Sequence, residues 1–199
     1  MSVINSYKVC FLGRTGNGKT TLINALFGTN FNTDPLVACT KELYSVTLMN
    51  NCPEGFEGIT VYDTPGIGEF SSDAIYQRFY EEAVSEANCI VLVTTLDRTD
   101  APAQRLISRI LPFVNAKAAP VKFVVAVNHI DSKVVAGEKT YTPWDDIENK
   151  PTETCLNNIE ERIDIINQRF NKYLPISAIV PVSGLRKYGI NELKTIIES

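Results

Sequence analysis

The 199-residue sequence lacks a continuous apolar segment long enough to cross a lipid bilayer. A transmembrane helix needs roughly 20 consecutive apolar residues, and no apolar run of this chain reaches that length. The amino-terminal stretch MSVINSYKVCFLGRTG also lacks the basic region followed by a long apolar region that marks a secretory signal. We therefore expect a cytoplasmic protein.

Paired cysteines and an excess of positive charge are missing as well. The five cysteines are an odd number and form no CxxC pair, which argues against a disulfide framework or a metal cluster. Cys10 and Cys89 stand in apolar runs, where cysteine is usually a small core residue. The net charge is −4, so the sequence gives no direct sign of binding to nucleic acid or to an anionic membrane.

What the sequence does contain is a regular alternation of short apolar runs with longer amphipathic segments. The apolar, β-branched runs predict strands at 7–12, 43–49, 58–63, 89–95, 121–128 and 178–183. Several of these runs are apolar at every position, which is typical of strands covered by helices on both faces. In 43–49, Ser45 and Thr47 alternate with apolar residues, which predicts an edge strand.

Helices are predicted between these strands because apolar residues recur there at steps of three and four. They begin near Lys19 and after Asp100, and cover about 72–88, 152–173 and 190–198. This alternation predicts an α/β fold with a parallel, doubly wound sheet. No repeat or linker divides the chain, so we expect one domain over residues 1–199.

One segment, 132–152, is polar, has no periodicity and contains the only tryptophan. We expect a long loop there, and loops of this length are usually functional or disordered. Trp144 is expected to pin the loop to the fold, and ligand binding by Trp144 is the alternative.

The segment GRTGNGKT, residues 13–20, fits the phosphate-loop pattern GxxxxGK[ST] between a predicted strand and a predicted helix. Its glycines allow the backbone N–H groups to turn toward one point, where the helix N-terminus adds a positive end. Lys19 can then reach the β- and γ-phosphates, and the Thr20 hydroxyl can bind Mg²⁺. The alternative is a glycine-rich turn that holds no ligand.

In VYDTPGIGE, Asp63 ends a predicted strand, from which a carboxylate can hold Mg²⁺ through water, and the Gly66 N–H can sense a γ-phosphate. In VVAVNHID, another strand ends with Asn128 and Asp131. The Asp131 carboxylate can accept hydrogen bonds from N1–H and the exocyclic amine of guanine, a donor pair that adenine lacks. The alternative is that both side chains only cap a loop. His129, the only histidine, is expected to pack over the base or the loop.

A fourth segment, VPVSGLRKYG, offers a backbone N–H near Ser183–Gly184–Leu185 to the guanine oxygen. In this order, GRTGNGKT, DTPG, NHID and SGL resemble the motifs of the G domain of translation-factor-related GTPases. Within them the chain looks most like the Era-like group, with likeness to immunity-related and septin-type GTPases. The resemblance implies a three-layer Ras-like fold with a six-stranded, mostly parallel sheet, one antiparallel edge strand, and GTP, GDP and Mg²⁺ as ligands.

The resemblance also implies that Thr40 is the switch threonine that closes on Mg²⁺. The candidate nucleotide-binding residues are Gly13, Arg14, Thr15, Gly16, Asn17, Gly18, Lys19, Thr20, Thr21, Asn128, His129, Asp131, Ser183, Gly184 and Leu185. The candidate Mg²⁺ ligands are Thr20, Thr40 and Asp63, and the candidate catalytic residues are Lys19, Thr40, Gly66 and Glu69.

Three positions depart from the family pattern. His129 replaces the lysine of NKxD, which weakens stacking on the base. Ile67 stands where Ras-like members carry a glutamine that positions the attacking water. The asparagine of potassium-activated relatives would stand at Gly16, whereas here it is Asn17, which puts a potassium site in doubt.

We expect slow, Mg²⁺-dependent GTP hydrolysis that orders and releases two switch segments, about 33–42 and 64–72. Glu69 is the nearest polar residue that can align a water, and Arg14 is a candidate charge donor, although both also fit plain surface roles. The rival hypothesis is a nucleotide-controlled assembly or binding module with little or no hydrolysis. A second copy of the chain, in a nucleotide-dependent homodimer, is a candidate partner, and no residue identifies an effector protein or ribonucleoprotein.

Overall fold

The computed structural model describes residues 4–32, 43–49, 52–66, 74–96, 101–132, 142–173 and 175–199. A six-stranded sheet runs through them in the order β2-β3-β1-β4-β5-β8. Only β2 is antiparallel to its neighbour, and the other neighbouring strands are parallel. The strands are β1 (Ser6–Gly13), β2 (Tyr44–Leu48), β3 (Gly58–Asp63), β4 (Cys89–Thr95), β5 (Lys122–Asn128) and β8 (Ala178–Pro181).

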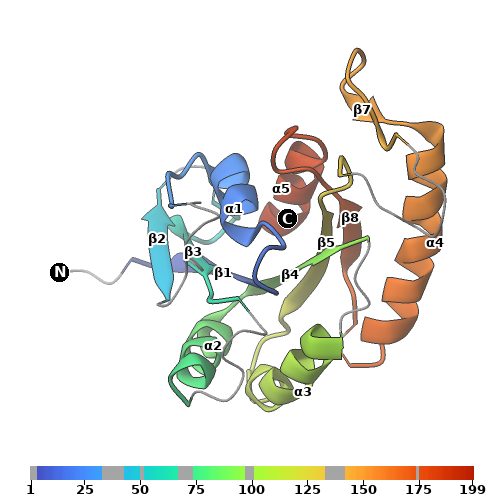
Figure 1. Cartoon of the computed structure of the whole chain (residues 1–199). Helices are drawn as coiled ribbons and strands as arrows, with labels where there is room; N and C mark the ends of the chain where they lie inside the picture. The colour runs from blue at the N-terminus through green and yellow to red at the C-terminus, as the bar shows by residue number, and fades with distance from the viewer. Residues whose placement is uncertain are drawn as a thin grey trace.

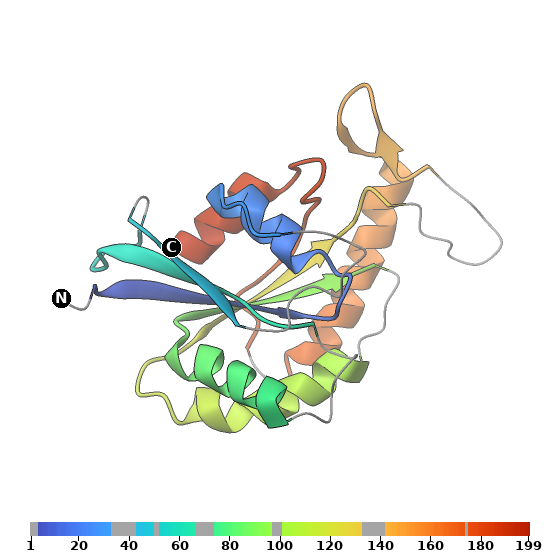
Figure 2. The ribbon, with the colours of Figure 1, turned by 60° about the vertical axis from the view of Figure 1, so that its left-hand side comes forward.

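Helices cover both faces of this sheet and make three layers (Figures 1 and 2). One face packs against α1 (Lys19–Phe27) and α5 (Ile190–Glu198). The other face packs against α2 (Ala74–Glu86), α3 (Ala101–Asn115) and α4 (Glu153–Phe170). The expected α/β fold, with a mostly parallel six-stranded sheet and one antiparallel edge strand, is therefore confirmed.

Strand β1 shows why the central runs are apolar at nearly every position. Val9 and Phe11 belong to the core beneath α1 and α5, whereas Cys10 and Leu12 belong to the core beneath α2, α3 and α4. All four side chains are fully buried, because successive residues of a strand point to opposite faces. The predicted core position of Cys10 is thus confirmed, and Cys89 is equally buried.

Strand β2 has the opposite character, as its alternating sequence predicts. Ser45 and Thr47 are exposed, and β2 pairs only with β3 at the edge of the sheet. The Thr47 and Thr60 hydroxyls form a cross-strand hydrogen bond of 2.9 Å. The predicted edge strand is therefore confirmed.

The described part of the predicted 132–152 loop holds a small hairpin, which corrects that expectation for residues 142–152, whereas residues 133–141 lie outside the described residues. Strands β6 (Trp144–Asp145) and β7 (Lys150–Pro151) pair antiparallel beside the start of α4. The Thr152 side chain then caps α4 by accepting a hydrogen bond from the Cys155 backbone N–H. Trp144 is 4% exposed, and its ring contacts Tyr188 edge-on. The expectation that Trp144 pins this segment is confirmed.

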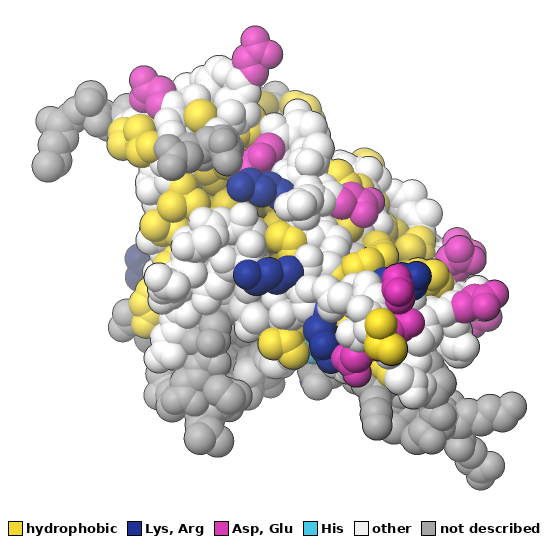
Figure 3. Space-filling view, turned by 90° about the horizontal axis from the view of Figure 1, so that it is seen from above, with side chains coloured by type: hydrophobic (Ala, Val, Ile, Leu, Met, Phe, Trp, Pro, Cys, Tyr) yellow, Lys and Arg dark blue, Asp and Glu magenta, His cyan; other side chains and the backbone are white. Residues whose placement is uncertain are grey.

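Charged side chains of both signs are mixed on the face shown in Figure 3. Among the helices in the described ranges, none combines the length and the apolar character that crossing a membrane requires.

Candidate nucleotide-binding site

The candidate site lies at one edge of the sheet, where the parallel strands end. Strands β1, β3 and β5 end at Gly13, Asp63 and Asn128, and the parallel alignment brings these ends to the same edge. The strand order reverses at β1, since β3 lies on one side of it and β4 on the other. Ligands of open α/β sheets bind at such a reversal, outside the carboxyl ends of the strands.

The phosphate loop turns back on itself between β1 and α1. Gly16 and Gly18 adopt left-handed backbone conformations, with φ of 81° and 77°. A Cβ atom on Gly18 would lie 2.6 Å from Asn128 Nδ2 and 2.6 Å from His129 Nε2. Gly18 is therefore needed both for its backbone conformation and for the close approach of the NHID segment.

The Lys19 side chain is bonded to the backbone at the start of the phosphate loop. Its Nζ donates hydrogen bonds of 3.1 Å to the Gly13 carbonyl and 3.3 Å to the Arg14 carbonyl. The side chain is only 6% exposed, and burial lowers the pKa of its ammonium to about 8, although the Asp63 carboxylate opposes this shift. A phosphate placed in the loop would supply the negative charge that this buried ammonium lacks.

Thr20 and Asp63 meet beside Lys19 and make a donor set that fits Mg²⁺. The Thr20 hydroxyl donates a 2.7 Å hydrogen bond to Asp63 Oδ2. The other oxygen of this buried carboxylate, Oδ1, has no hydrogen-bond partner among the described residues. Burial raises the pKa of Asp63, against the hydrogen bond from Thr20 and the charge of Lys19. Because Mg²⁺ prefers hard oxygen ligands and few protein donors, this hydroxyl–carboxylate pair fits the ion.

The DTPG segment lies directly against the phosphate loop. Gly66 is so close to Thr15 that a Cβ atom on Gly66 would overlap the Thr15 side chain and backbone. The Thr64 hydroxyl donates to the Phe11 carbonyl at 2.7 Å, and the Tyr80 hydroxyl donates to the Pro65 carbonyl at 2.6 Å. Sequence reasoning assigned no role to Thr64, which lies within DTPG, or to Tyr80, which lies outside the four motifs, because both side chains bond to backbone carbonyls of the chain.

Asn128 joins three of the four motifs. Its Nδ2 donates to the Asn17 carbonyl of the phosphate loop at 2.9 Å, and its Oδ1 accepts from the Gly184 N–H of the SGL segment at 3.2 Å. The side chain is 1% exposed, so both bonds are shielded from water. The structure therefore brings GRTGNGKT, NHID and SGL together at one place through a single amide.

Asn17 and His129, two departures from the family pattern, both face protein groups. The buried Asn17 amide donates a 2.8 Å hydrogen bond to the Val93 carbonyl of β4. His129 has a left-handed backbone, with φ of 61°, and its Nε2 lies toward Gly18. The expected packing of His129 was over the base or over the loop. The structure places His129 against the phosphate loop.

The loop after β8 is folded tightly beside Asp131. Ser183 and Tyr188 exchange two backbone hydrogen bonds of 3.0 and 3.1 Å, and the Ser183 hydroxyl accepts from the Arg186 N–H. The Asp131 side chain is 10% exposed, and its Oδ2 lies 4.0 Å from Arg186 Nε. Leu185 is 77% exposed at the tip of this loop. Arg186 was not among the predicted site residues, because it directly follows the SGL motif in the segment VPVSGLRKYG and only SGL was assigned a contact with the base.

Part of the predicted site lies outside the described residues, namely Thr40, Ile67, Glu69, the whole segment 33–42 and residues 67–72. The other predicted residues of the phosphate loop, Arg14, Thr15 and Thr21, are half-buried around Lys19 and Thr20.

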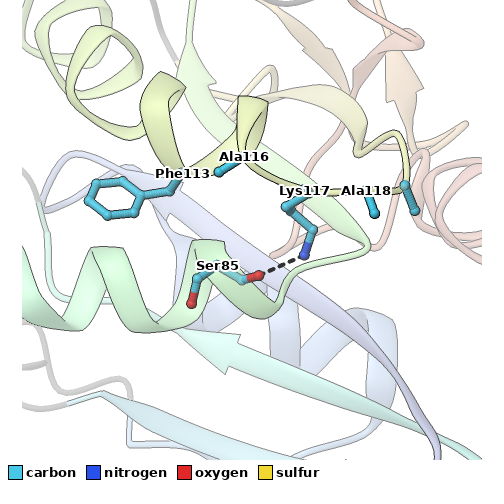
Figure 4. Close-up of a pocket in the computed structure, with 6 residues that line it drawn as sticks. Ser85, Phe113, Ala116, Lys117 and Ala118 are labelled. Carbon is cyan, nitrogen blue, oxygen red and sulfur yellow. Dashed lines mark hydrogen bonds between the residues drawn. The ribbon is translucent and has the colours of Figure 1, made fainter.

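A separate cavity of about 430 Å³ lies at the opposite edge of the sheet (Figure 4). It is lined by Ser85 near the carboxyl end of α2, by Phe113 in the last turn of α3, and by the segment that connects α3 to β5, including Lys117. Lys117 Nζ donates to the Ser85 carbonyl across it at 2.8 Å. Because the strands start at this edge, the cavity is distant from the candidate nucleotide site.

Solved structures of Era share this fold. The complex of Era with MgGDPNP and a segment of 16S ribosomal RNA has a TM-score of 0.66 and 22% identity, covering 98% of this chain and 57% of that chain. Aquifex aeolicus Era bound to GDP·AlF4⁻ has a TM-score of 0.64 and 24% identity, covering 98% and 56%.

Sequence comparison extends the likeness to a GTPase and to translation initiation factors. The GTPase HflX of Thermofilum pendens is 28% identical over 191 residues, which are 94% of this chain and 38% of that protein. Translation initiation factor IF-2 of Chlamydia muridarum is 30% identical over 139 residues, 70% of this chain and 14% of the factor. The chain thus spans much less than half the length of these curated relatives. The fold is that of the G domain of Era, residues 8–129 match the family profile described as 50S ribosome-binding GTPase, and the chain belongs to that family.

Proposed function

We propose that this chain binds GTP and GDP with Mg²⁺, hydrolyses GTP slowly and acts as a conformational switch. Membership of a GTPase family supports the guanine nucleotide as ligand. The observation that carries the proposal is the pair of hydrogen bonds in which the Asn128 amide donates to the Asn17 carbonyl and accepts from the Gly184 N–H, because it joins the phosphate loop to the candidate base-binding segments. A single nucleotide can then contact Lys19 with its phosphates and Asp131 with its base.

The roles of the residues follow from their surroundings. Lys19 and the loop N–H groups would hold the β- and γ-phosphates, Thr20 and Asp63 would hold Mg²⁺, and the Gly66 N–H would bind the γ-phosphate. An Mg²⁺ ion held there would supply positive charge against the charge that develops on the phosphate oxygens. Thr40 is proposed as the residue that closes on Mg²⁺ in the GTP state.

Slow hydrolysis is proposed because Ile67 has no polar group that can orient a water molecule. We expect a turnover of roughly 10⁻³ s⁻¹ or below without a partner, as for unassisted small GTPases. Glu69 is the proposed residue that aligns the attacking water, and Glu69→Ala tests this role by a single-turnover assay. Turnover equal to that of the unchanged protein would remove Glu69 from the mechanism.

The base preference is tested by melting temperature in the presence of GDP, ADP or XDP, each with Mg²⁺. GDP should raise the melting temperature, and ADP should have little effect because adenine offers Asp131 no donor pair. Asp131→Asn should shift the preference from GDP toward XDP. The proposal fails if GDP stabilises the protein no more than ADP does.

Single-turnover conversion of bound GTP tests whether the switch is an enzyme or only a nucleotide-controlled binding module. Release of phosphate that depends on Mg²⁺ supports the switch with hydrolysis. GTP that stays intact on the protein, alone and at concentrations that favour self-association, would support the binding module instead.

We further propose that residues 1–199 form one G domain, and that a ribosomal particle is the partner to test first. The Era structure contains 16S ribosomal RNA, and the family is described as ribosome-binding. Co-sedimentation with ribosomal subunits in GDP and in a non-hydrolysable GTP analogue tests this partner. Light scattering in the same two nucleotides tests the nucleotide-dependent homodimer.

A further inference from the structure

Arg186 connects the candidate base-binding segment to the β6–β7 hairpin. Its Nη2 lies 2.7 Å from Asp146 Oδ1 in the hairpin, and its Nε lies 4.0 Å from Asp131 Oδ2. Its guanidinium carbon lies 5.8 Å from the centre of the Trp144 ring. One cation therefore contacts an acidic residue on each side and an aromatic ring of the hairpin.

Hydrogen bonds and a ring contact hold the loop that carries Arg186. The Arg186 N–H donates to the Ser183 hydroxyl, and Ser183 and Tyr188 close the loop with two backbone hydrogen bonds. The Tyr188 ring contacts Trp144 edge-on, with ring centres 5.6 Å apart. Trp144 itself is 4% exposed. The hairpin thus contacts the guanidinium of Arg186 through two residues, the carboxylate of Asp146 and the ring of Trp144.

The two acidic partners of Arg186 differ in their exposure. The Asp146 side chain is 73% exposed, whereas that of Asp131 is 10% exposed. The short contact to Asp146 fixes the guanidinium, because its donors have fixed directions in one plane. The longer contact to Asp131 attracts the carboxylate and still leaves its oxygens able to accept hydrogen bonds from a ligand.

We propose that Arg186 is a positioning residue for guanine specificity, held by the β6–β7 hairpin, which orients the Asp131 carboxylate toward both hydrogen-bond donors of the base. This inference rests on the proposed function, in which Asp131 receives guanine. Guanine offers N1–H and an exocyclic amine, whereas hypoxanthine offers N1–H alone. A carboxylate free to rotate keeps the first bond and loses the second, so Arg186 acts on the preference for guanine over hypoxanthine.

The test measures the Kd of GDP and of IDP for the unchanged protein and for Arg186→Gln. We expect GDP binding to weaken roughly tenfold, the worth of one hydrogen bond to a charged group, while IDP binding changes less than about twofold. Asp146→Asn, at an exposed position, should produce a smaller change in the same direction. Arg186→Lys keeps the charge but not the planar fork, and should restore the preference for GDP only in part.

Lys187→Gln is the matched control, since it removes a positive charge from the next residue of the same loop and should leave both affinities unchanged. A purely structural role for Arg186 would weaken GDP and IDP equally and would lower the melting temperature. In an Asp131→Asn background, Arg186→Gln should no longer change the ratio of the two affinities, because the carboxylate that it orients is gone.

The outcomes separate the two proposals. If the unchanged protein binds neither GDP nor IDP, or binds ADP equally well, the proposed function fails. If the unchanged protein prefers GDP and both Arg186→Gln and Asp146→Asn keep that preference in full, the inference about Arg186 is overturned while the proposed function stands.

Discussion

The two edges of the sheet treat their charged residues in opposite ways. At the carboxyl ends of the strands, Lys19 and Asp63 are almost fully buried, and Asp63 Oδ1 has no hydrogen-bond partner within the described ranges. At the amino ends, Lys8 and Glu86 form a partly exposed ion pair of 2.5 Å, to which the Tyr62 hydroxyl adds a hydrogen bond of 3.1 Å. At the carboxyl ends a buried carboxylate oxygen is left to bind a ligand. At the amino ends the charged groups are paired with each other.

The pKa shifts of Lys19, Asp63 and Glu86 follow the same division. Burial is the largest cause at the site, where it lowers the pKa of Lys19 to about 8 and raises that of Asp63. At the other edge the hydrogen bond from Lys8 is the largest cause, and it lowers the pKa of Glu86. Groups whose charged forms lose stability through burial are those that gain most when a phosphate or a cation arrives.

The largest expected effect separates two lysines, one at each edge. Lys19→Met should weaken GTP and GDP binding by at least about 100-fold, because it removes a buried cation from the phosphate loop. Lys117→Met, beside the cavity at the opposite edge, should leave nucleotide affinity within about twofold. Titration calorimetry measures both, and equal losses in the two variants would refute the division between the edges.

Two asparagines provide the next comparison. Asn128→Ala should lower the free energy of unfolding by about 2–4 kcal/mol and weaken GDP binding, because it removes two buried hydrogen bonds, one to the Asn17 carbonyl and one from the Gly184 N–H. Asn88→Ala removes the acceptor for the Lys8 N–H at the amino edge, and should lower stability without changing the affinity for GDP. Urea unfolding and GDP titration of both variants test this separation.

Asp63→Asn should change the free energy of unfolding less than Asn128→Ala does, and should raise it. Removing a buried charge with an unpartnered oxygen should raise the free energy of unfolding of the nucleotide-free protein by about 1–2 kcal/mol. The same substitution should abolish the Mg²⁺ dependence of GTP affinity, measured with and without EDTA. A variant that is less stable and still responds to EDTA would show that Asp63 is a structural residue.

The smallest effect is expected for Glu86→Gln, which should lower the free energy of unfolding by about 1 kcal/mol or less at pH 7, since the pair is partly exposed. The folded-state pKa of Glu86 lies below its ordinary value of 4.5, so its stabilisation is present above pH 4.5 and is lost as pH falls through the folded pKa. The free energies of unfolding of the unchanged protein and of Glu86→Gln should differ at pH 7 and converge at pH 3. The affinity for GDP at pH 7 should be the same for both.

The strands and the motifs were predictable because they are local. The runs that became β1, β3, β4 and β5 lie within one residue of their predicted bounds at either end, since apolar composition over six to eight residues indicates a buried strand. The hairpin was not predictable, because each of its strands has two residues, which are too few for any periodicity. In addition, β7 contains Pro151, and proline is typical of strand ends and edges. Arg186 was missed for a related reason, since its acidic partners come from two other segments.

The sequence by itself determined the alternation of strands and helices, the edge strand and the chemical types in the phosphate loop, DTPG, NHID and SGL. Short-range patterns are sufficient for these because strand and helix periodicity act over a few residues. Only the tertiary structure decided how the motifs are joined. Asn128 bonds to Asn17 across 111 positions and to Gly184 across 56, and such contacts exist only after the sheet has brought the strand ends together.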